Sequence, residues 1–216
     1  MSRDLGVIIL AAGRSQRMGR PKMLLPWGNT SILGHLVAQW QALGVHQIAV
    51  VCALDDAGIA AELNRLGIPA EQRIFNPSPE RGMFSSIQCA AQWPAWQTAL
   101  THWALVLGDQ PHLREETLRK LLEFSAAHPQ AVCQPAHGGH RHHPVVLPKD
   151  AFQQLATSTA TDLKEFLKPL PTARCEMDDA GLELDIDEPE DYERARAAHR
   201  LICQQPKQRS MNGRKR

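Results

Sequence analysis

Short apolar runs alternate along this chain with longer segments whose apolar positions recur at helical spacing. The apolar runs cover residues 5–10, 47–52, 73–75, 103–107 and 131–134. Strand-length runs separated by helix-length segments are typical of a largely parallel sheet with crossover helices. The pattern therefore predicts an α/β fold class.

Capping residues and helix breakers mark where the helices should begin and end. The apolar periodicity predicts helices over 31–43, 56–66 and 114–127. Each of them ends just before a helix breaker: Gly44, Gly67 and Pro129, respectively. A last helix over 188–202 opens with Pro189 and two acidic residues, which suit a helix N-terminus. Each predicted helix except the last lies between two predicted strands.

Length and composition favour one domain. The chain has 216 residues, and we expect a single α/β domain over 1–203. A basic tail over 204–216 should follow it and stay disordered. The net charge of +1 argues against a nucleic-acid-coating protein. No segment approaches the roughly 18 apolar residues of a membrane span, so we expect no nucleic-acid partner and no membrane partner.

The cysteines indicate the compartment. Five are present without any Cys-x-x-Cys pair, and an odd number fits poorly with a secreted disulfide framework. We therefore expect a cytoplasmic protein.

A loop rich in small residues and positive charge follows the first apolar run. It reads Leu10-Ala11-Ala12-Gly13-Arg14 and continues to Arg17 and Lys22. Small residues let backbone N–H groups approach anionic oxygens, and the basic side chains neutralise charge that the backbone alone would hold weakly. The loop predicts a triphosphate site, although it lacks the Gly-Lys-Ser/Thr of a Walker loop and the Gly-x-Gly-x-x-Gly of dinucleotide folds.

An aspartate ends the apolar run 103–107, within Gly108-Asp109-Gln110-Pro111. Mg²⁺ prefers one or two carboxylates together with phosphate oxygens, so Asp109 is a candidate metal ligand. Asp109 can equally cap the helix that starts near Arg114, or order a turn. In open α/β sheets the loops at the carboxyl ends of strands converge, so this loop and the first one should face one cleft.

Acidic and apolar residues alternate just before the last helix, in Leu184-Asp185-Ile186-Asp187. In extended backbone this spacing points Asp185 and Asp187 to the same side, and one of them can complete a metal site. The alternative is helix capping and compensation of the helix dipole by Asp187, Glu190 and Asp191.

Three motifs, at residues 10–22, 108–111 and 185–191, follow one another along the chain in the same order as in a known family. They resemble the motifs of the molybdenum cofactor cytidylyltransferases, within the sugar-nucleotidyltransferase-like NTP transferase superfamily. The resemblance extends over roughly residues 5–200. It implies a Rossmann-like three-layer α/β/α sandwich with a mostly parallel sheet. It also implies Mg²⁺-dependent transfer of CMP from CTP to the phosphate of molybdopterin, with release of pyrophosphate, and a molybdoenzyme or its chaperone as a partner.

The resemblance assigns roles to the residues of the first and last motifs. It implies that Arg17 and Lys22 hold the triphosphate beside the turn formed by Leu10, Ala11, Ala12, Gly13 and Arg14. The two cations would stabilise the phosphate in the transition state. It implies that Asp109 and Asp187 hold the Mg²⁺, and that Arg17, Lys22 and Asp109 are the catalytic residues. The attacking group would be an ionised phosphate, so no general base is expected.

Residues 76–87 form a Pro/Gly loop that runs into a helix, and the family's matching stretch helps to hold the nucleotide base. Gly82 and Ser86 are therefore candidates for base binding, although Ser85 or Ser86 can equally be a helix N-cap. Guanylyl-transferring relatives tend to carry a second glycine where this chain has Ala12. The extra methyl group favours a pyrimidine.

The acceptor side is represented by His143 and Asp162. The family often shows Arg-Gly-His-Pro before a strand, matched here by Arg141-His142-His143-Pro144, where His142 replaces the glycine. Asp162 corresponds to an acidic position near the family's acceptor region, and a helix N-cap explains it equally well.

Other functions remain open at this point. One alternative is nucleotidyl transfer of the same kind that uses another nucleoside triphosphate or another phosphorylated acceptor. A different class is a non-catalytic carrier that binds a cofactor or a metal through the histidines of 137–143. For a metal, those histidines lack a carboxylate or a cysteine pair at ligand spacing.

Overall fold

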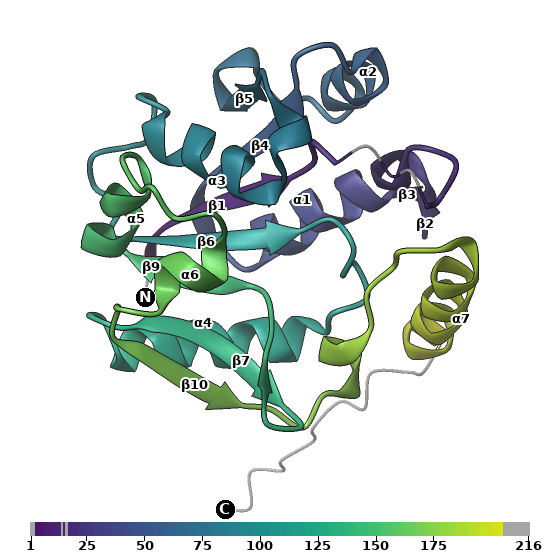
Figure 1. The fold of residues 1–216 in the computed structure, drawn as a ribbon. Helices are drawn as coiled ribbons and strands as arrows, with labels where there is room; N and C mark the ends of the chain where they lie inside the picture. The colour runs from purple at the N-terminus through teal and green to yellow at the C-terminus, as the bar shows by residue number, and fades with distance from the viewer. Residues whose placement is uncertain (1–2, 14, 16, 205–216) are drawn as a thin grey trace, which may run out of the picture.

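The computed structural model describes residues 3–13, 15 and 17–204, and Arg14 and the predicted tail beyond residue 204 lie outside these ranges. An eight-stranded sheet forms its centre, in the order β10-β7-β9-β6-β1-β4-β5, with β8 paired to β7 (Figure 1). The strands of this sheet are β1 (Arg3–Leu10), β4 (Val45–Ala53), β5 (Arg73–Asn76), β6 (His102–Leu107), β7 (Val132–His137), β8 (His140–Arg141), β9 (Val145–Pro148) and β10 (Thr172–Glu176). A separate hairpin pairs β2 (Pro26–Trp27) with β3 (Thr30–Ser31).

The sheet is mostly parallel, which confirms the predicted fold class. β1 pairs in parallel with β4 and β6, β4 with β5, and β7 with β10. The exception is β9, which runs antiparallel between β6 and β7. Its residues are all buried, and a strand buried on both faces reads as a continuous apolar run in either direction, so its sequence carries no sign of its orientation.

Helices cover both faces of the sheet, as a three-layer sandwich requires. The long helices are α1 (Ile32–Ala42), α2 (Ala57–Arg65), α3 (Met83–Gln92), α4 (Glu115–Ala127) and α7 (Pro189–Gln204), and the short ones are α5 (Lys149–Leu155) and α6 (Leu163–Leu167). Buried residues of α1, α2, α4 and α7 form one apolar cluster with the sheet, and those of α3, α5 and α6 form the other.

Side-chain caps fix the helix boundaries that the sequence predicts. Ser31 Oγ accepts a hydrogen bond of 2.9 Å from the Gly34 N–H at the start of α1. Asp56 Oδ1 accepts one of 2.9 Å from the Ile59 N–H at the start of α2. Each satisfies one of the backbone donors that a helix N-terminus leaves unpaired.

Strand register brings the two candidate loops together. Leu10, the last residue of β1, is the register partner of Leu107, the last residue of β6. The loops that follow therefore leave the same edge of the sheet side by side. Within the part of the chain that the structure describes, no helix is long and apolar enough to cross a membrane.

Helix α7 is fastened to the β2–β3 hairpin by the side chain that follows its first turn. The Tyr192 side chain is 2% exposed, its hydroxyl donates to the Pro26 carbonyl over 2.5 Å, and its ring lies 6.4 Å from that of Trp27. This contact holds the residues just before α7, which include Asp187, against the loop after β1.

We expect Tyr192→Phe to lower the free energy of unfolding by about 1 to 3 kcal/mol, because the substitution keeps the packing but leaves a carbonyl without its donor. Urea denaturation of the two proteins measures the difference. An unchanged midpoint and slope would show that the hydroxyl contributes nothing to holding α7.

Candidate active site

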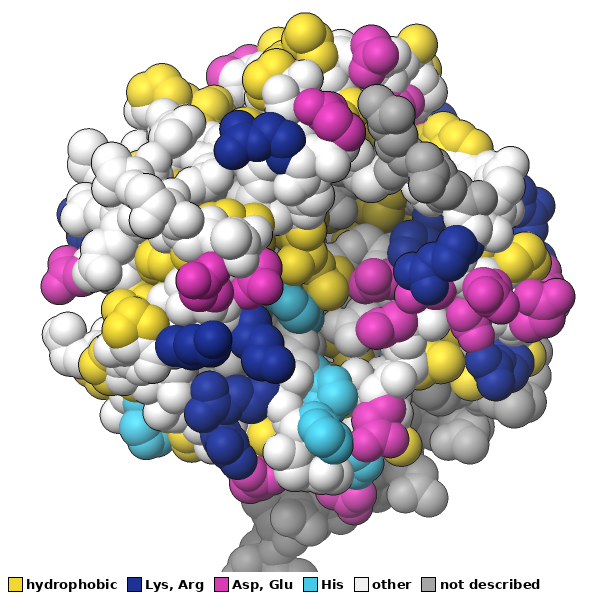
Figure 2. All heavy atoms as spheres, viewed as in Figure 1, with side chains coloured by type: hydrophobic (Ala, Val, Ile, Leu, Met, Phe, Trp, Pro, Cys, Tyr) yellow, Lys and Arg dark blue, Asp and Glu magenta, His cyan; other side chains and the backbone are white. Residues whose placement is uncertain are grey.

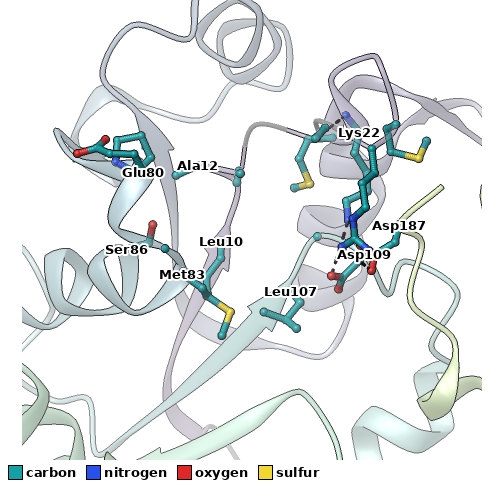
Figure 3. Close-up of a pocket in the computed structure, with 18 residues that line it drawn as sticks. Leu10, Ala12, Lys22, Glu80, Met83, Ser86, Leu107, Asp109 and Asp187 are labelled. Atoms are coloured by element: carbon teal, nitrogen blue, oxygen red, sulfur yellow. Dashed lines mark hydrogen bonds and ion pairs between the residues drawn. The ribbon is translucent and has the colours of Figure 1, made fainter. Parts of the chain in front are cut away.

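A cavity of about 550 Å³ opens at the sheet edge where β1 and β6 end (Figure 3). Its walls come from the loop after β1, the loop before α3, the loop after β6 and the segment before α7. Its lining includes the sequence-predicted residues Leu10, Ala11, Ala12, Gly13, Arg17, Lys22, Gly82, Ser86, Asp109 and Asp187. The predicted nucleotide-binding Arg14 lies outside the described residues.

Two basic side chains meet two carboxylates on one wall of this cavity. Lys22 Nζ lies 3.7 Å from Asp109 Oδ2 and 3.7 Å from Asp187 Oδ1, and Arg17 Nη2 lies 2.9 Å from Asp187 Oδ2. Figure 3 shows the Lys22 side chain reaching down between the labelled aspartates. Residues far apart in the sequence thus form one compact cluster of opposite charges.

Asp109 is the most unusual member of the cluster. Its Oδ1 is buried and has no hydrogen-bond partner among the described residues. Burial raises the pKa of its carboxyl above the ordinary value, the positive charge of Lys22 opposes this, and the negative charges of Asp185 and Asp187 add to it. A buried acceptor without a donor is unfavourable unless a cation or donor reaches it.

The alternative role of Asp109 as a helix cap is wrong. The N-cap position of α4 belongs to Arg114, and no side chain makes a capping hydrogen bond there. The loop also packs closely on the turn after β1, because a methyl group at Gly108 would lie 2.2 Å from the sulfur of Met23. A side chain at Gly108 would therefore displace the Met23 side chain from its place against this loop.

Of the two aspartates before α7, the structure places Asp187 in the cavity. Asp185 instead accepts a hydrogen bond of 2.8 Å from the Gln110 side-chain amide. The capping alternative holds for Asp191 and not for Asp187, because Asp191 Oδ2 accepts from the backbone N–H groups of Asp187 and Glu188 at 3.2 and 3.0 Å. Asp187 thereby keeps its carboxylate for the cluster.

The turn between the glycines and Lys22 depends on a residue that the sequence did not single out. Ser15 has φ of 48°, the left-handed region, and its Oγ accepts from the Lys22 N–H over 3.0 Å. This bond fixes the backbone from which the Lys22 side chain enters the cavity. A serine in a loop of small and basic residues carries no distinguishing signal, so its role emerges only from the geometry.

The opposite wall contains Gly82 and Ser86. Helix α3 starts at Met83 with Gly82 as its N-cap, so the alternative of Ser85 or Ser86 as N-cap is wrong. Asn76 Nδ2 donates to Ser85 Oγ at 2.8 Å and to Ser86 Oγ at 2.9 Å. Asn76 was missed by sequence reasoning, and the available signal was an amide directly after an apolar strand.

The predicted acceptor residues do not line the cavity. Asp162 Oδ1 accepts from the Glu165 N–H over 2.7 Å, which confirms the N-cap alternative for this residue. His143 lies just before β9, with Nδ1 3.5 Å from the Leu105 carbonyl of β6. Burial lowers the pKa of His143 to about 4, so its imidazole is neutral at physiological pH.

Among the described residues, the histidines of 137–143 do not form a metal-binding group. His137 Nδ1 lies 2.9 Å from the Met177 carbonyl. Within the described ranges no three His, Cys, Asp or Glu side chains are grouped so as to hold a metal ion. The carrier hypothesis therefore loses the metal-binding group on which it depends.

The charge distribution of the surface agrees with this layout. Figure 2 shows a hollow near the centre of this face, with Lys or Arg and Asp or Glu side chains together on its right-hand wall and histidines below it. A nucleotide-sized cavity with fixed cations and adjacent carboxylates, at the carboxyl edge of an α/β sheet, is the kind of site that nucleotidyl transfer requires.

Comparison with known proteins identifies the class as nucleotidyltransferase. Residues 7–175 match the family described as MobA-like NTP transferase domain, and the chain belongs to that family. The chain is 31% identical over 186 residues to the molybdenum cofactor cytidylyltransferase of Escherichia coli, which covers 86% of this chain and 92% of that protein. It is 28% identical over 145 residues to a molybdenum cofactor guanylyltransferase of Mesorhizobium japonicum, covering 66% of this chain and 65% of that protein.

Solved structures agree on the fold. The crystal structure of a Mycobacterium tuberculosis Rv0371c homologue from Mycobacterium sp. strain JC1 has a TM-score of 0.70 and 26% identity, covering 93% of this chain and 99% of the other. A nucleotidyl transferase from Methanothermobacter has a TM-score of 0.75 at 19% identity, covering 92% of this chain and 98% of the other.

The neutral His143 predicts a pH dependence of stability. Its pKa is lowered from 6.5 to about 4 in the folded protein, so between those values the unfolded chain binds a proton that the folded protein does not. The free energy of unfolding should therefore fall as the pH drops through this range. We expect His143→Asn to show a shallower fall than the parent protein in urea denaturation between about pH 7 and about pH 4.5. Parallel curves for the two proteins would contradict the neutral imidazole.

Proposed function

We propose that this nucleotidyltransferase transfers CMP from CTP to the terminal phosphate of a molybdopterin-type acceptor, with Mg²⁺ and with release of pyrophosphate. The observation that carries the proposal is the cluster of Arg17, Lys22, Asp109 and Asp187 on one wall of a nucleotide-sized cavity. The E. coli relative supports the nucleotide and the acceptor.

Asp109 and Asp187 suit a divalent cation. Both carboxylates approach one positive charge, the Lys22 ammonium, and Asp109 Oδ1 is a buried oxygen with no donor among the described residues. Mg²⁺ is commonly held by one or two carboxylates, with phosphate oxygens and water completing its ligands. When bound, it would neutralise phosphate charge and polarise the phosphorus–oxygen bonds. A neighbouring Rv0371c crystal structure is described as a manganese complex, and at 22% identity that comparison concerns the fold.

Arg17 and Lys22 supply the fixed positive charge for the triphosphate. An oxygen of the acceptor phosphate forms the new bond to the α-phosphorus, and the bond from that phosphorus to the bridging oxygen of pyrophosphate breaks. The acceptor oxygen is already ionised near neutral pH, so no side chain has to remove a proton. The enzyme's part is to align two anions that repel each other and to offset their charge.

The cavity wall proposed to bind the nucleotide base favours CTP. Ala12, Gly82 and Ser86 line the same cavity. Guanylyl-transferring relatives tend to carry a glycine at the position of Ala12, so the extra methyl group favours the smaller pyrimidine base. The cytidylyltransferase relative also matches more of this chain than the guanylyltransferase does. GTP is kept as the second candidate because of that guanylyltransferase.

His143 and Asp162 are proposed for the acceptor side only on the family resemblance. His143 precedes β9, beside the end of β6, and its neutral imidazole can donate to or accept from a polar acceptor group. A molybdoenzyme or its chaperone would receive the product, in the cytoplasm.

Pyrophosphate release from purified protein tests the proposal. The assay pairs CTP, GTP, UTP or ATP with molybdopterin or another phosphorylated acceptor, with Mg²⁺ and with chelator as the control. We expect turnover with CTP and molybdopterin, abolished by chelation. Preference for GTP would replace the base assignment, turnover only with another acceptor would replace the acceptor, and no release with any pair would overturn both.

Lys22→Ala should reduce kcat/KM for the nucleotide on the order of 10²-fold, because it removes a fixed positive charge from the developing negative charge of the transition state. Lys164→Ala, on the exposed face of α6, is the matched control and should keep the parental rate. A near-parental rate for Lys22→Ala would contradict its place in the phosphate site.

A further inference from the structure

The segment before α7 carries Asp187 into the cavity, and it is held at its centre by backbone contacts. Ile186 is fully buried, its N–H donates to the Asp109 carbonyl over 3.0 Å, and its carbonyl accepts from Lys22 Nζ over 2.7 Å. These contacts fix the position of Ile186. The direction in which the neighbouring carboxylates point also depends on what holds either side of it.

Gln110 supplies that second point of attachment. Its side chain is 6% exposed and comes from the same loop as Asp109. Its Nε2 donates to Asp185 Oδ1 over 2.8 Å and to the Leu182 carbonyl over 3.4 Å. The donor is therefore a buried side chain, whereas Asp185 is exposed on the segment that has to be oriented.

We propose that Gln110 is a positioning residue: its side-chain amide fixes Asp185 and thereby holds the Asp187 carboxylate opposite Asp109. Asp185 and Asp187 flank Ile186 in alternating backbone, so rotation of the segment about Ile186 moves both carboxylates together. An amide is suited to this position because it donates to the carboxylate without adding charge beside Asp109. A carboxylate there would repel Asp185, and an apolar side chain would leave its orientation to water.

A simpler explanation is that Gln110 only stabilises the fold. Gln39 makes a bond of similar kind, because its Nε2 donates over 2.7 Å to the Leu113 carbonyl further along the same loop. That bond does not touch the segment before α7. Gln39→Met and Gln110→Met therefore remove comparable bonds, of which only one leads to Asp187.

The first test measures the attachment itself and needs no activity. The Ile186 N–H should exchange with deuterium at least about 10-fold faster in Gln110→Met than in the parent protein, since opening of the segment exposes it. Gln39→Met should leave this rate unchanged. Equal exchange in the parent and Gln110→Met would overturn the inference, even if the proposed transferase activity were absent.

The second test measures the site and rests on the proposed function. Binding of Mn²⁺ in the presence of CTP, followed by electron paramagnetic resonance, and the Mg²⁺ dependence of kcat are compared for parent, Gln110→Met and Gln39→Met. Loss of a partner that orients a metal ligand typically lowers metal affinity or activity about 10–100-fold. In Gln110→Met we therefore expect metal binding to be weakened at least about 10-fold and kcat to be lower, with little change in KM for CTP. Parental metal binding in that variant would overturn the inference.

A double-mutant cycle that combines Gln110→Met with Asp185→Ala tests whether Gln110 acts through Asp185. If Gln110 acts through Asp185, the double variant should be no worse than either single variant, whereas independent roles would give multiplied losses. Multiplied losses would overturn the inference. A parent protein without turnover that still binds Mn²⁺ would count against the proposed function and leave the exchange, Mn²⁺ binding and cycle measurements decisive for Gln110.

Discussion

The arrangement of this site depends on one side chain, that of Lys22. Its ammonium joins three parts of the chain that are distant in sequence: the loop after β1, the loop after β6 and the segment before α7. The lysine is mostly buried, so water screens these attractions less than it would on an open surface. Without a positive charge there, two carboxylates and a carbonyl would face each other across a small gap.

This balance has a cost for Asp109. A carboxylate with an unpaired buried oxygen is unfavourable for the fold, and the raised pKa of Asp109 expresses that cost. Sites built for ligand binding commonly carry such unfavourable groups, because the ligand supplies what the protein lacks. The charged side chains of this cluster do not fully satisfy one another, and a bound cation would supply the partner that Asp109 Oδ1 lacks.

Much of the fold follows from local patterns in the sequence. The helix ends at Ser31 and Asp56 were predictable because the capping residue is adjacent to the helix that it caps. The placement of Asp109 and Lys22 in one cavity was also predictable, because carboxyl ends of parallel strands share an edge. These inferences need only short-range pattern and one general property of parallel sheets.

What escaped prediction involves partners far apart in sequence. The bond from Gln110 to Asp185 and that from Asn76 to Ser86 join residues whose pairing no periodicity encodes. The local spacing does not distinguish Asp185 from Asp187, and only the family resemblance singled out Asp187 before the structure placed it in the cavity. The direction of β9 escaped because its buried residues read alike in either direction.

The reversed strand β9 has a consequence for how such an enzyme diversifies. Because β9 lies between β6 and β7, it separates their ends by two strand spacings, roughly 9 to 10 Å. Its first residue, Val145, pairs with Leu105 near the end of β6, so the segment before β9 reaches the edge where its neighbours finish. A change in the segment between β8 and β9 would therefore alter the surface beside the end of β6, while the loop after β1 lies on the other side of β6 and keeps its place.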